Sequence, residues 1–310
     1  MDQLTYDEVE AAARRIAGRV RPVAMAPGDD GGRTWLALEF LQHTGSFKAR
    51  GAQNFLLAHA EAGTLPDTGV TIASGGNAGL ACAWAARELG VRATVFLPET
   101  ASPVKLARLR SYGAQVRLAG REYAEALAAC EEFAADSGAL ASHAYDHPLI
   151  AAGAGTVLAE IRDRVPGLDT VVVSVGGGGL FAGVAVAARE HGVRVLAVEP
   201  TGSRALNAAL AAGHPVDVPV DSVAQDALGA RRATALAVAA AGHEGVRSVL
   251  VDDEAIVRAR RRLWEERRIA VEFAASTALA AVDRADGERV AVLLCGANTD
   301  PSDLVDRERG

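Results

Sequence analysis

Residues 170–190, TVVVSVGGGGLFAGVAVAARE, place a strand, a tight turn and a helix one after another. The first six residues form a largely apolar and β-branched run, four glycines follow directly, and an alanine-rich segment of helix length comes next. Strands that are apolar on both faces and alternate with helices are typical of parallel sheets covered by helices on both sides. The stretch therefore predicts one βα unit of a doubly wound α/β fold.

The same alternation of strand-like runs and alanine-rich segments extends along most of the chain. Further strand-like runs lie at 70–74, 93–98, 114–119, 194–199, 248–253 and 289–296. At 310 residues, half of them apolar, the chain is long enough for about two domains with a substantial core. Thr5 and Glu8 have the spacing of a capping box at the start of a helix. We expect open, doubly wound parallel sheets.

Composition and charge exclude several classes of function. The 32 basic and 39 acidic residues give a formal net charge of −7 without a long block of one sign, which argues against a nucleic-acid partner. The chain has no apolar run of membrane-spanning length, and its N-terminus is acidic, so we expect no membrane association and a cytoplasmic location. Cys82, Cys130 and Cys295 lie far apart without CxxC spacing, which predicts neither disulfides nor a zinc site.

Lysine is nearly absent, because only Lys48 and Lys105 occur among the 32 basic residues and the others are arginine. Arginine keeps its proton in proteins, so chemistry that needs a neutral side-chain amine must use one of these two lysines. Lys48 lies in HTGSFKARG, residues 43–51, where an apolar run leads into a helix. The positive end of a helix dipole favours the neutral amine, so this position fits Schiff-base chemistry. We expect Lys105, on an arginine-rich helix, to be an exposed residue.

Two glycine-rich turns follow strand-like runs and begin helices. SGGNAG at residues 74–79 and GGGG at residues 176–179 both let backbone N–H groups approach an anion at a helix start. The second turn also fits the dinucleotide pattern G-x-G-x-x-A from Gly177 to Ala182, and Glu199 ends the next strand about 20 residues on. On this turn alone, an NAD-dependent enzyme of the Rossmann type is an open alternative.

A fourth unusual turn, CGANTD at residues 295–300, follows the apolar run VAVLL. Its thiol is either a functional group or a small apolar core residue. The carboxyl ends of parallel strands meet at one edge of a sheet, and the active sites of open parallel sheets lie there. The turns at 43–51, 74–79, 176–179 and 295–300 are therefore the candidates for the active site.

In their order and approximate spacing, SFKARGA, SGGNAG, GGGGL and CGAN resemble the fold-type II pyridoxal-phosphate enzymes, in particular the serine/threonine dehydratase and serine racemase group. The resemblance covers nearly the whole chain. It implies a tryptophan synthase β-like fold with a large cofactor-anchoring domain of residues 1–52 and 146–310, and a small mobile domain of residues 53–145. It also implies a homodimer.

The resemblance assigns the site residue by residue. Lys48 would hold pyridoxal 5'-phosphate as an internal aldimine and act as the catalytic base. Phe47 would pack against the cofactor ring, Asn77 would bond the 3-oxygen of the ring, and Cys295 would face the ring nitrogen. Backbone amides would complete the site, with Gly176, Gly177, Gly178 and Gly179 at the phosphate and Ser74, Gly75, Gly76, Asn77 and Ala78 at the substrate carboxylate.

Three positions depart from the pattern of that family. Gly75 stands where racemising members carry an acid/base serine, which predicts weak or absent racemase activity. Ala78 replaces the usual histidine, so any polar contact of that histidine is lost. At the divalent-cation site of the racemase branch, Glu199 and the carbonyl of Ser203 are kept but Ala205 replaces an aspartate, so we predict no metal.

A neutral thiol at the ring nitrogen makes the cofactor a weaker electron sink than a carboxylate would, which favours elimination over transamination. The resemblance thus predicts dehydration and deamination of a small amino acid, L-threonine or L-serine, to 2-oxobutyrate or pyruvate and ammonia. Alternatives are 3-hydroxyaspartate dehydration, with Arg121 at the second carboxylate, cysteine-synthase-like β-replacement, and a binding protein without turnover. Glu272 matches either a family glutamate near the ring edge or a carboxylate on a surface helix.

Overall fold

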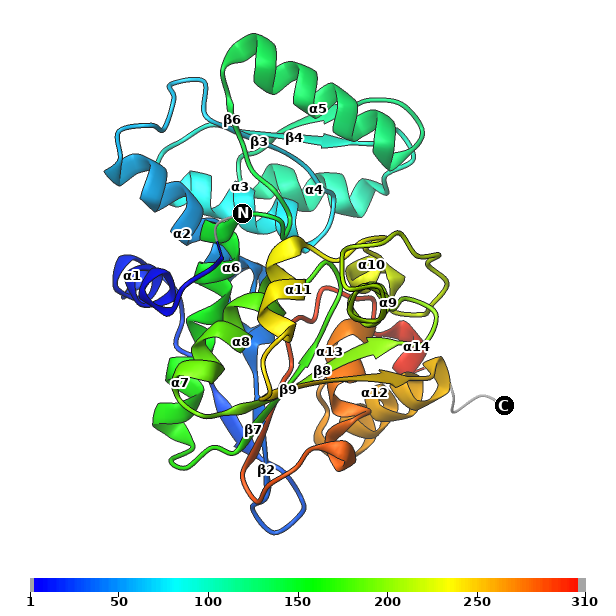
Figure 1. The fold of residues 1–310 in the computed structure, drawn as a ribbon. Helices are drawn as coiled ribbons and strands as arrows, with labels where there is room; N and C mark the ends of the chain where they lie inside the picture. The colour runs from blue at the N-terminus through cyan, green and yellow to red at the C-terminus, as the bar shows by residue number, and fades with distance from the viewer. Residues whose placement is uncertain (1–2, 306–310) are drawn as a thin grey trace.

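The computed structural model describes residues 3–305 and contains two sheets (Figure 1). In spatial order, the large sheet consists of β1 (Met25–Pro27), β2 (Thr34–Ala37), β10 (Val290–Leu293), β7 (Thr170–Ser174), β8 (Arg194–Pro200) and β9 (Val246–Val251). The small sheet consists of β5 (Gln115–Leu118), β4 (Ala93–Leu97), β3 (Val70–Ala73) and β6 (Leu140–Ala141). Every pair of neighbours is parallel except β1 with β2. The predicted fold of open parallel sheets is confirmed, with one antiparallel strand at an edge.

Helices cover the faces of both sheets. The helices that precede β6 in the chain are α1 (Tyr6–Ile16), η1 (Glu39–Leu41), η2 (His43–Gly45), α2 (Lys48–Glu61), α3 (Asn77–Glu88), α4 (Pro103–Ser111) and α5 (Tyr123–Ser137). The remainder carries α6 (Pro148–Gly155), α7 (Val157–Arg164), α8 (Gly179–Glu190), α9 (Ala205–Ala212), α10 (Gln225–Leu228), α11 (Ala235–Ala241), α12 (Asp253–Arg267), α13 (Phe273–Leu279), η3 (Val282–Arg284) and α14 (Ser302–Val305). On the large sheet, α8 packs with α6 and α11, whereas α13 contacts β7, β8 and β10 and packs with α12 (Figure 1). No helix within residues 3–305 is long and apolar enough to cross a membrane.

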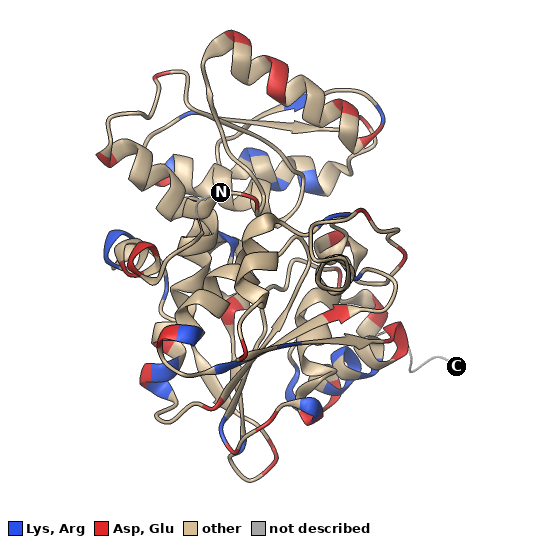
Figure 2. Cartoon of the chain, in the orientation of Figure 1, with Lys and Arg blue, Asp and Glu red and all other residues tan. Residues whose placement is uncertain are grey.

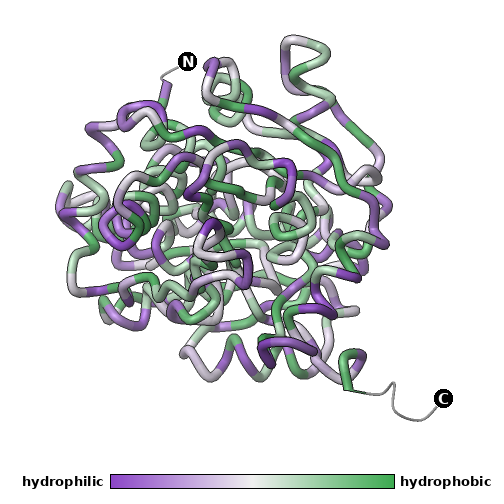
Figure 3. The backbone as a smooth tube through the Cα atoms, turned by 90° about the horizontal axis from the view of Figure 1, so that it is seen from below, coloured by the Kyte–Doolittle hydropathy of each residue, from purple (hydrophilic) through white to green (hydrophobic). Residues whose placement is uncertain are grey.

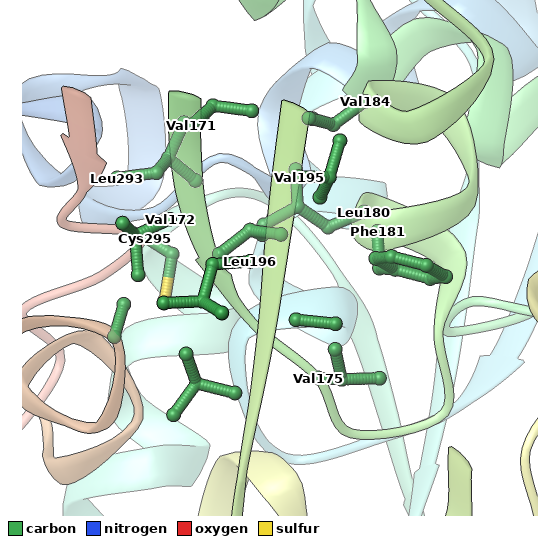
Figure 4. Packing of buried hydrophobic residues seen from close by; sticks show 14 of the residues in the cluster. Val171, Val172, Val175, Leu180, Phe181, Val184, Val195, Leu196, Leu293 and Cys295 are labelled. Carbon is green, nitrogen blue, oxygen red and sulfur yellow. The ribbon is translucent and has the colours of Figure 1, made fainter. Parts of the chain in front are cut away.

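The main core lies around β7, whose residues are all buried. Figure 4 shows side chains of β7 and β8, among them Val172 and Leu196, packed between Phe181 of α8 and Cys295 after β10. Charged residues lie mainly on the outer helices and loops (Figure 2), and hydrophilic stretches follow the outer turns of the tube (Figure 3). The centre of the large sheet is thus supported by a core of apolar side chains.

Most predicted strands agree with the structure to within one or two residues, and the capping box of Thr5 and Glu8 is confirmed. The expected strand at 248–253 ends early, at Val251, because the Asp252 carboxylate accepts a hydrogen bond from the Ala255 amide at 2.6 Å and caps α12. The run at 114–119 forms β5, whose residues are mostly exposed because β5 is an edge strand. Burial on both faces therefore holds for the central strands and fails at this edge.

Candidate active site

The loop before Lys48 and the loop after β10 are joined by backbone contacts. Ser46 and Gly296 form an isolated antiparallel bridge, and the Phe47 amide donates to the Cys295 carbonyl at 2.9 Å. Lys48 is the first residue of α2, and Phe47 precedes it at the N-cap. Two segments that are about 250 residues apart in the chain thus lie side by side at the carboxyl end of the large sheet.

The amine of Lys48 is enclosed by protein, although the residue as a whole is only half-buried. Its Nζ donates to the Ala144 carbonyl at 2.6 Å and lies 4.9 Å from the Phe47 ring centre and 5.9 Å from that of Tyr145. Burial lowers the pKa of Lys48 to about 8, against the opposing effect of nearby Cys295 and Glu272. A substantial fraction of this amine is therefore neutral near pH 8.

A buried ion-pair network holds α2 just after Lys48. The Arg50 side chain is fully buried, and it binds Glu39 of η1 with an Nε–Oε1 distance of 2.5 Å and Glu160 of α7 with an Nη1–Oε1 distance of 2.6 Å. A buried guanidinium is tolerated only when its charge and donors are matched. Arg50 lies within the SFKARGA segment, but its two partners carry no sequence signal that identifies them in advance.

The loop Gly176–Gly179 forms a tight backbone cup between β7 and α8. Gly178 has a φ of +100°, and a Cβ on it would lie 2.3 Å from the Ala237 Cβ. A Cβ on Gly177 would lie 2.2 Å from the Tyr145 ring, and one on Gly179 would lie 2.6 Å from the Tyr145 carbonyl oxygen. Side chains are excluded at these positions, and the backbone N–H groups at the start of α8 are suited to an anion such as a phosphate.

The turn from Ser74 to Ala78 lies between β3 and α3 of the small sheet, and α3 begins at Asn77. A Cβ on Gly75 would lie 2.5 Å from the Leu97 Cδ2 atom, whereas a Cβ on Gly76 would meet nothing within 4 Å. The Gly76 amide donates to the Ser74 hydroxyl at a long 3.4 Å. Ser74 and Ala78 are partly exposed, so this turn is accessible to a small molecule.

A hydrogen-bonded triad connects this turn to the large sheet. The Asn77 amide nitrogen donates to Glu272 at 2.9 and 3.0 Å from the two carboxylate oxygens. The Asn298 side chain donates to Asn77 Oδ1 at 2.6 Å, and the Asn298 backbone amide donates to Glu272 Oε1 at 2.7 Å. Asn298 belongs to the CGAN segment, but its part in this triad was not predicted from the sequence, because no local pattern indicates which residues it meets.

Glu272 is buried at the start of α13, so the alternative of a surface-helix carboxylate is wrong. Burial raises the pKa of Glu272, and the hydrogen bonds from Asn77 and Asn298 oppose that effect. The carboxylate is thus held at the junction of the two sheets, close enough to Lys48 to influence the amine.

Cys295 is buried after β10, and its Sγ lies 3.7 Å from the Ser174 hydroxyl at the end of β7. Burial raises the pKa of the Cys295 thiol to about 12, so the thiol is neutral at physiological pH. The position combines the two sequence-based expectations, since the thiol packs in the core and also lies near Lys48.

Two predicted positions lie away from this cluster. Glu199 caps α9, because its carboxylate oxygens accept the amides of Leu206 at 2.7 Å and Asn207 at 2.8 Å, and burial raises its pKa to about 7. In the part of the chain that the structure describes, no group of three His, Cys, Asp or Glu residues is arranged to hold a metal. Arg121 is exposed, and its backbone amide donates to Glu125 at 2.6 Å.

The residues of the cluster fit pyridoxal phosphate. The glycine cup that a Cβ would fill suits a phosphate, the enclosed Lys48 amine suits an aldehyde, and the neutral Cys295 thiol suits an unprotonated ring nitrogen. Glu199, the residue that a dinucleotide fold would need at the adenosine ribose, is engaged with the Leu206 and Asn207 amides at the start of α9.

Comparison with known proteins agrees with this geometry. A family model described as "pyridoxal-phosphate dependent enzyme" matches residues 18–296. An L-threonine ammonia-lyase of Geobacter sulfurreducens is 35% identical over 310 residues, covering 96% of this chain and 76% of the relative. A serine dehydratase-like protein of Homo sapiens is 37% identical over 283 residues, covering 85% and 84%. The solved structure of maize serine racemase superposes with a TM-score of 0.91 at 27% identity, covering 99% and 97%.

These matches confirm the fold-type II resemblance and show that the dinucleotide alternative is wrong. The family model includes the turns at 43–51, 74–79 and 176–179 and ends at Gly296, inside the fourth turn, and the structural match covers 99% of the chain. Together with the glycine cup and the enclosed amine, they establish that the chain belongs to the family of pyridoxal-phosphate dependent enzymes.

Proposed function

We propose that this enzyme dehydrates and deaminates L-threonine or L-serine, forming 2-oxobutyrate or pyruvate and ammonia. The single observation that carries the proposal is the enclosed Lys48 amine, whose lowered pKa of about 8 leaves it able to accept a proton. The names of the relatives support the same chemistry, since they include threonine ammonia-lyases and serine dehydratase-like proteins.

In this proposal the chain holds the cofactor through the residues of the cluster. The amides of Gly176–Gly179 would hold the phosphate, Phe47 would pack on the ring, Asn77 would contact the 3-oxygen and Cys295 would face the ring nitrogen. When bound, pyridoxal phosphate supplies an electron sink for the bond at the substrate α-carbon. The amides of Ser74–Ala78 bind the substrate carboxylate at the start of α3.

Lys48 has two tasks in this scheme. It anchors the cofactor, and once the substrate amine has replaced it, its free Nζ removes the α-proton of the substrate. The enclosed position keeps water away from the amine and disfavours its charged form, which is the form that cannot act as a base. Phe47 and Tyr145 bring aromatic faces near the same nitrogen.

Cys295 directs the outcome after the proton has been removed. A neutral thiol leaves the ring nitrogen without a proton, so negative charge at the α-carbon is stabilised less than it would be by a carboxylate partner. Loss of the β-hydroxyl as water, with the proton that Lys48 has taken from the α-carbon, would consume that charge at once, whereas transamination would need it to persist. The thiol therefore favours elimination.

The remaining parts of the proposal concern organisation. Residues 53–145 form a small domain that closes over the substrate, and the Asn77–Glu272–Asn298 triad is the contact made in the closed state. The enzyme acts as a homodimer in the cytoplasm without a metal, a membrane or a nucleic acid. Three free and buried cysteines support a reducing compartment.

The test is the absorbance spectrum of the protein reconstituted with pyridoxal phosphate, recorded before and after addition of L-threonine or L-serine. We expect a visible band that changes with either amino acid while ammonia and a 2-oxo acid accumulate. Lys48→Ala should bind the cofactor without the lysine linkage and release no ammonia, with an unchanged circular dichroism spectrum. A spectral change without ammonia contradicts elimination, and a product that requires sulfide indicates β-replacement instead.

A further inference from the structure

The second lysine of the chain also lies beside the candidate active site. Lys105 belongs to the first turn of α4, and its Cδ lies 3.8 Å from the position that a Cβ would take on Gly75. Because Gly75 has no side chain, the lysine stem and Leu97 lie beside the space that a side chain would take at the turn. The prediction that Lys105 is an exposed helix residue is confirmed, but the sequence does not indicate that it lies beside Gly75.

The α4 helix is held against the turn by its packing. A Cβ on Gly79 would lie 3.5 Å from the Leu109 side chain, which is fully buried in the core of the small sheet. The Lys105 amide donates to the Ser102 hydroxyl, which caps the helix. The backbone of Lys105 is therefore fixed, while its ammonium, two bonds beyond Cδ, is free to move over the turn.

The charge of α4 is unusual in this chain. The helix carries Lys105, Arg108 and Arg110 and no acidic residue, whereas the whole chain has a net charge of −7. Within residues 3–305, none of these three side chains takes part in an ion pair. Figure 2 shows the basic bands on α4. A positive charge without a partner beside a turn of backbone amides attracts an anion.

Lysine at this position differs chemically from the arginine that the chain uses almost everywhere else. Its ammonium is a compact charge on a flexible stem, which can follow a ligand as it enters and leaves, whereas a guanidinium is a rigid planar fork. The stem lies beside Gly75, and the residue is exposed, so that its charged end reaches water. This arrangement suits a transient anionic ligand.

We propose that Lys105 binds the α-carboxylate of the substrate together with the backbone amides of Ser74–Ala78. The inference rests on the proposed function, because it takes the amino-acid substrate from there. Lys105 supplies the countercharge, and the amides supply directional hydrogen bonds. Its contribution is to substrate binding, so it acts equally on the substrate and on the transition state and leaves the proton transfer to Lys48.

The experiment compares two amines that cannot undergo elimination, glycine and ethylamine, which differ in the carboxylate. Each is titrated into the holoenzyme, and the dissociation constant is taken from the change in cofactor absorbance. We expect Lys105→Met, which keeps an apolar stem, to weaken glycine binding about three- to tenfold, as a partly exposed ion pair would. Ethylamine binding should be equal in the wild type and Lys105→Met.

Two further variants act as matched controls. Lys105→Arg should recover most of the glycine affinity, because it restores the charge. Arg108→Met removes a charge from the same helix one turn later and should leave glycine binding within about twofold of the wild type. With L-serine or L-threonine, Lys105→Met should raise KM by the same factor as for glycine, leave kcat within about twofold, and lose most of the salt dependence of KM.

The outcomes separate the two proposals. If glycine does not alter the cofactor spectrum of the wild type, the proposed function itself is contradicted. If glycine binds the wild type and Lys105→Met equally, the assignment of Lys105 is overturned while the proposed function stands. Equal losses for glycine and ethylamine would also overturn it, because the residue would then act on the cofactor or the fold and not on the carboxylate.

Discussion

The glycine cup at residues 176–179 and the turn at residues 74–79 are built alike and surrounded differently. Each connects a buried parallel strand to a helix and exposes backbone amides at the helix start. Neighbours from distant segments, Leu228, Tyr145 and Ala237, fill the space around the cup. The turn leaves Gly76 open on its outer side, and the ends of two side chains, Leu97 and Lys105, approach Gly75.

The difference indicates what each loop is built to hold. A cup in which Gly177, Gly178 and Gly179 leave no room for a Cβ is rigid, which suits the proposed role of holding a phosphate through many turnovers. A turn that is open on one side suits a substrate that enters and leaves. Packing holds the turn at Gly79, but at Gly76 the turn is open, and the triad with Glu272 connects it to the large sheet. The two loops therefore share a sequence pattern but not the same surroundings.

The largest effect should come from placing the same methyl group in both loops. Gly178→Ala adds a Cβ only 2.3 Å from the Ala237 Cβ at a residue with a φ of +100°. The close contact and the backbone strain together should cost about 2–4 kcal/mol of folding free energy. Part of that cost should appear as cofactor affinity, which we expect to fall about 30- to 100-fold. Equilibrium titration of the apoprotein with pyridoxal phosphate measures it.

Gly76→Ala is the matched control, since its Cβ meets nothing within 4 Å and its φ of −101° suits alanine. It should change the free energy of unfolding by less than about 0.5 kcal/mol and leave cofactor affinity unchanged. Adding Ala237→Gly to Gly178→Ala should restore part of the affinity by removing the close contact. Equal losses of cofactor affinity in Gly178→Ala and Gly76→Ala would show that the cup is no more rigid than the turn.

The two loops also differ in how far the sequence predicts their environment. The strand, the glycines and the helix of residues 170–190 form a local pattern, and so the cup and its place at the sheet edge could be predicted. Tyr145, which packs on the cup and approaches Lys48, comes from a segment without any motif. The fold follows from local periodicity, whereas the walls of the site come from elements joined only by tertiary packing.

The triad illustrates the same limit at the turn. Asn77 and Glu272 were each matched to a family position, but their direct hydrogen bond spans 195 residues of chain. The CGAN segment contains Asn298 but does not indicate its role, because an asparagine in a loop has many possible partners. A pattern of residue types indicates which strand ends meet, and it does not indicate which side chains bond there.

A second effect concerns Lys48, whose amine lies near Tyr145 on the side of the cup and is influenced by Glu272 on the side of the turn. Because its pKa is lowered to about 8, the rate at which the apoprotein captures pyridoxal phosphate should fall about tenfold per pH unit below that value and level off above it. Stopped-flow absorbance measures the rate. Free Nα-acetyl-lysine, with an amine pKa of about 10.4, is the reference, and an identical profile for the two would contradict an enclosed amine.

The smallest effect should come from cutting the link between the two regions. Glu272→Ala leaves the donors of Asn77 and Asn298 without their acceptor, which should lower the free energy of unfolding by about 1–3 kcal/mol at pH 4–5. The exposed Glu265→Ala, on α12, is the control and should change it by less than about 0.5 kcal/mol. Urea unfolding monitored by circular dichroism measures both.

The pH dependence of the stability lost in Glu272→Ala tests whether Glu272 is held in a buried position in solution. Burial raises the pKa of Glu272 in the folded state above its value in the unfolded chain, so the folded protein binds the proton more tightly. The stability that Glu272 contributes is then fully present below the unfolded pKa and is lost as the pH rises through the folded one. The difference between the wild type and Glu272→Ala should therefore shrink from pH 4 to pH 8. A difference that grows over this range would mean that the hydrogen bonds from Asn77 and Asn298 outweigh burial, and the turn would then be as firmly held as the cup.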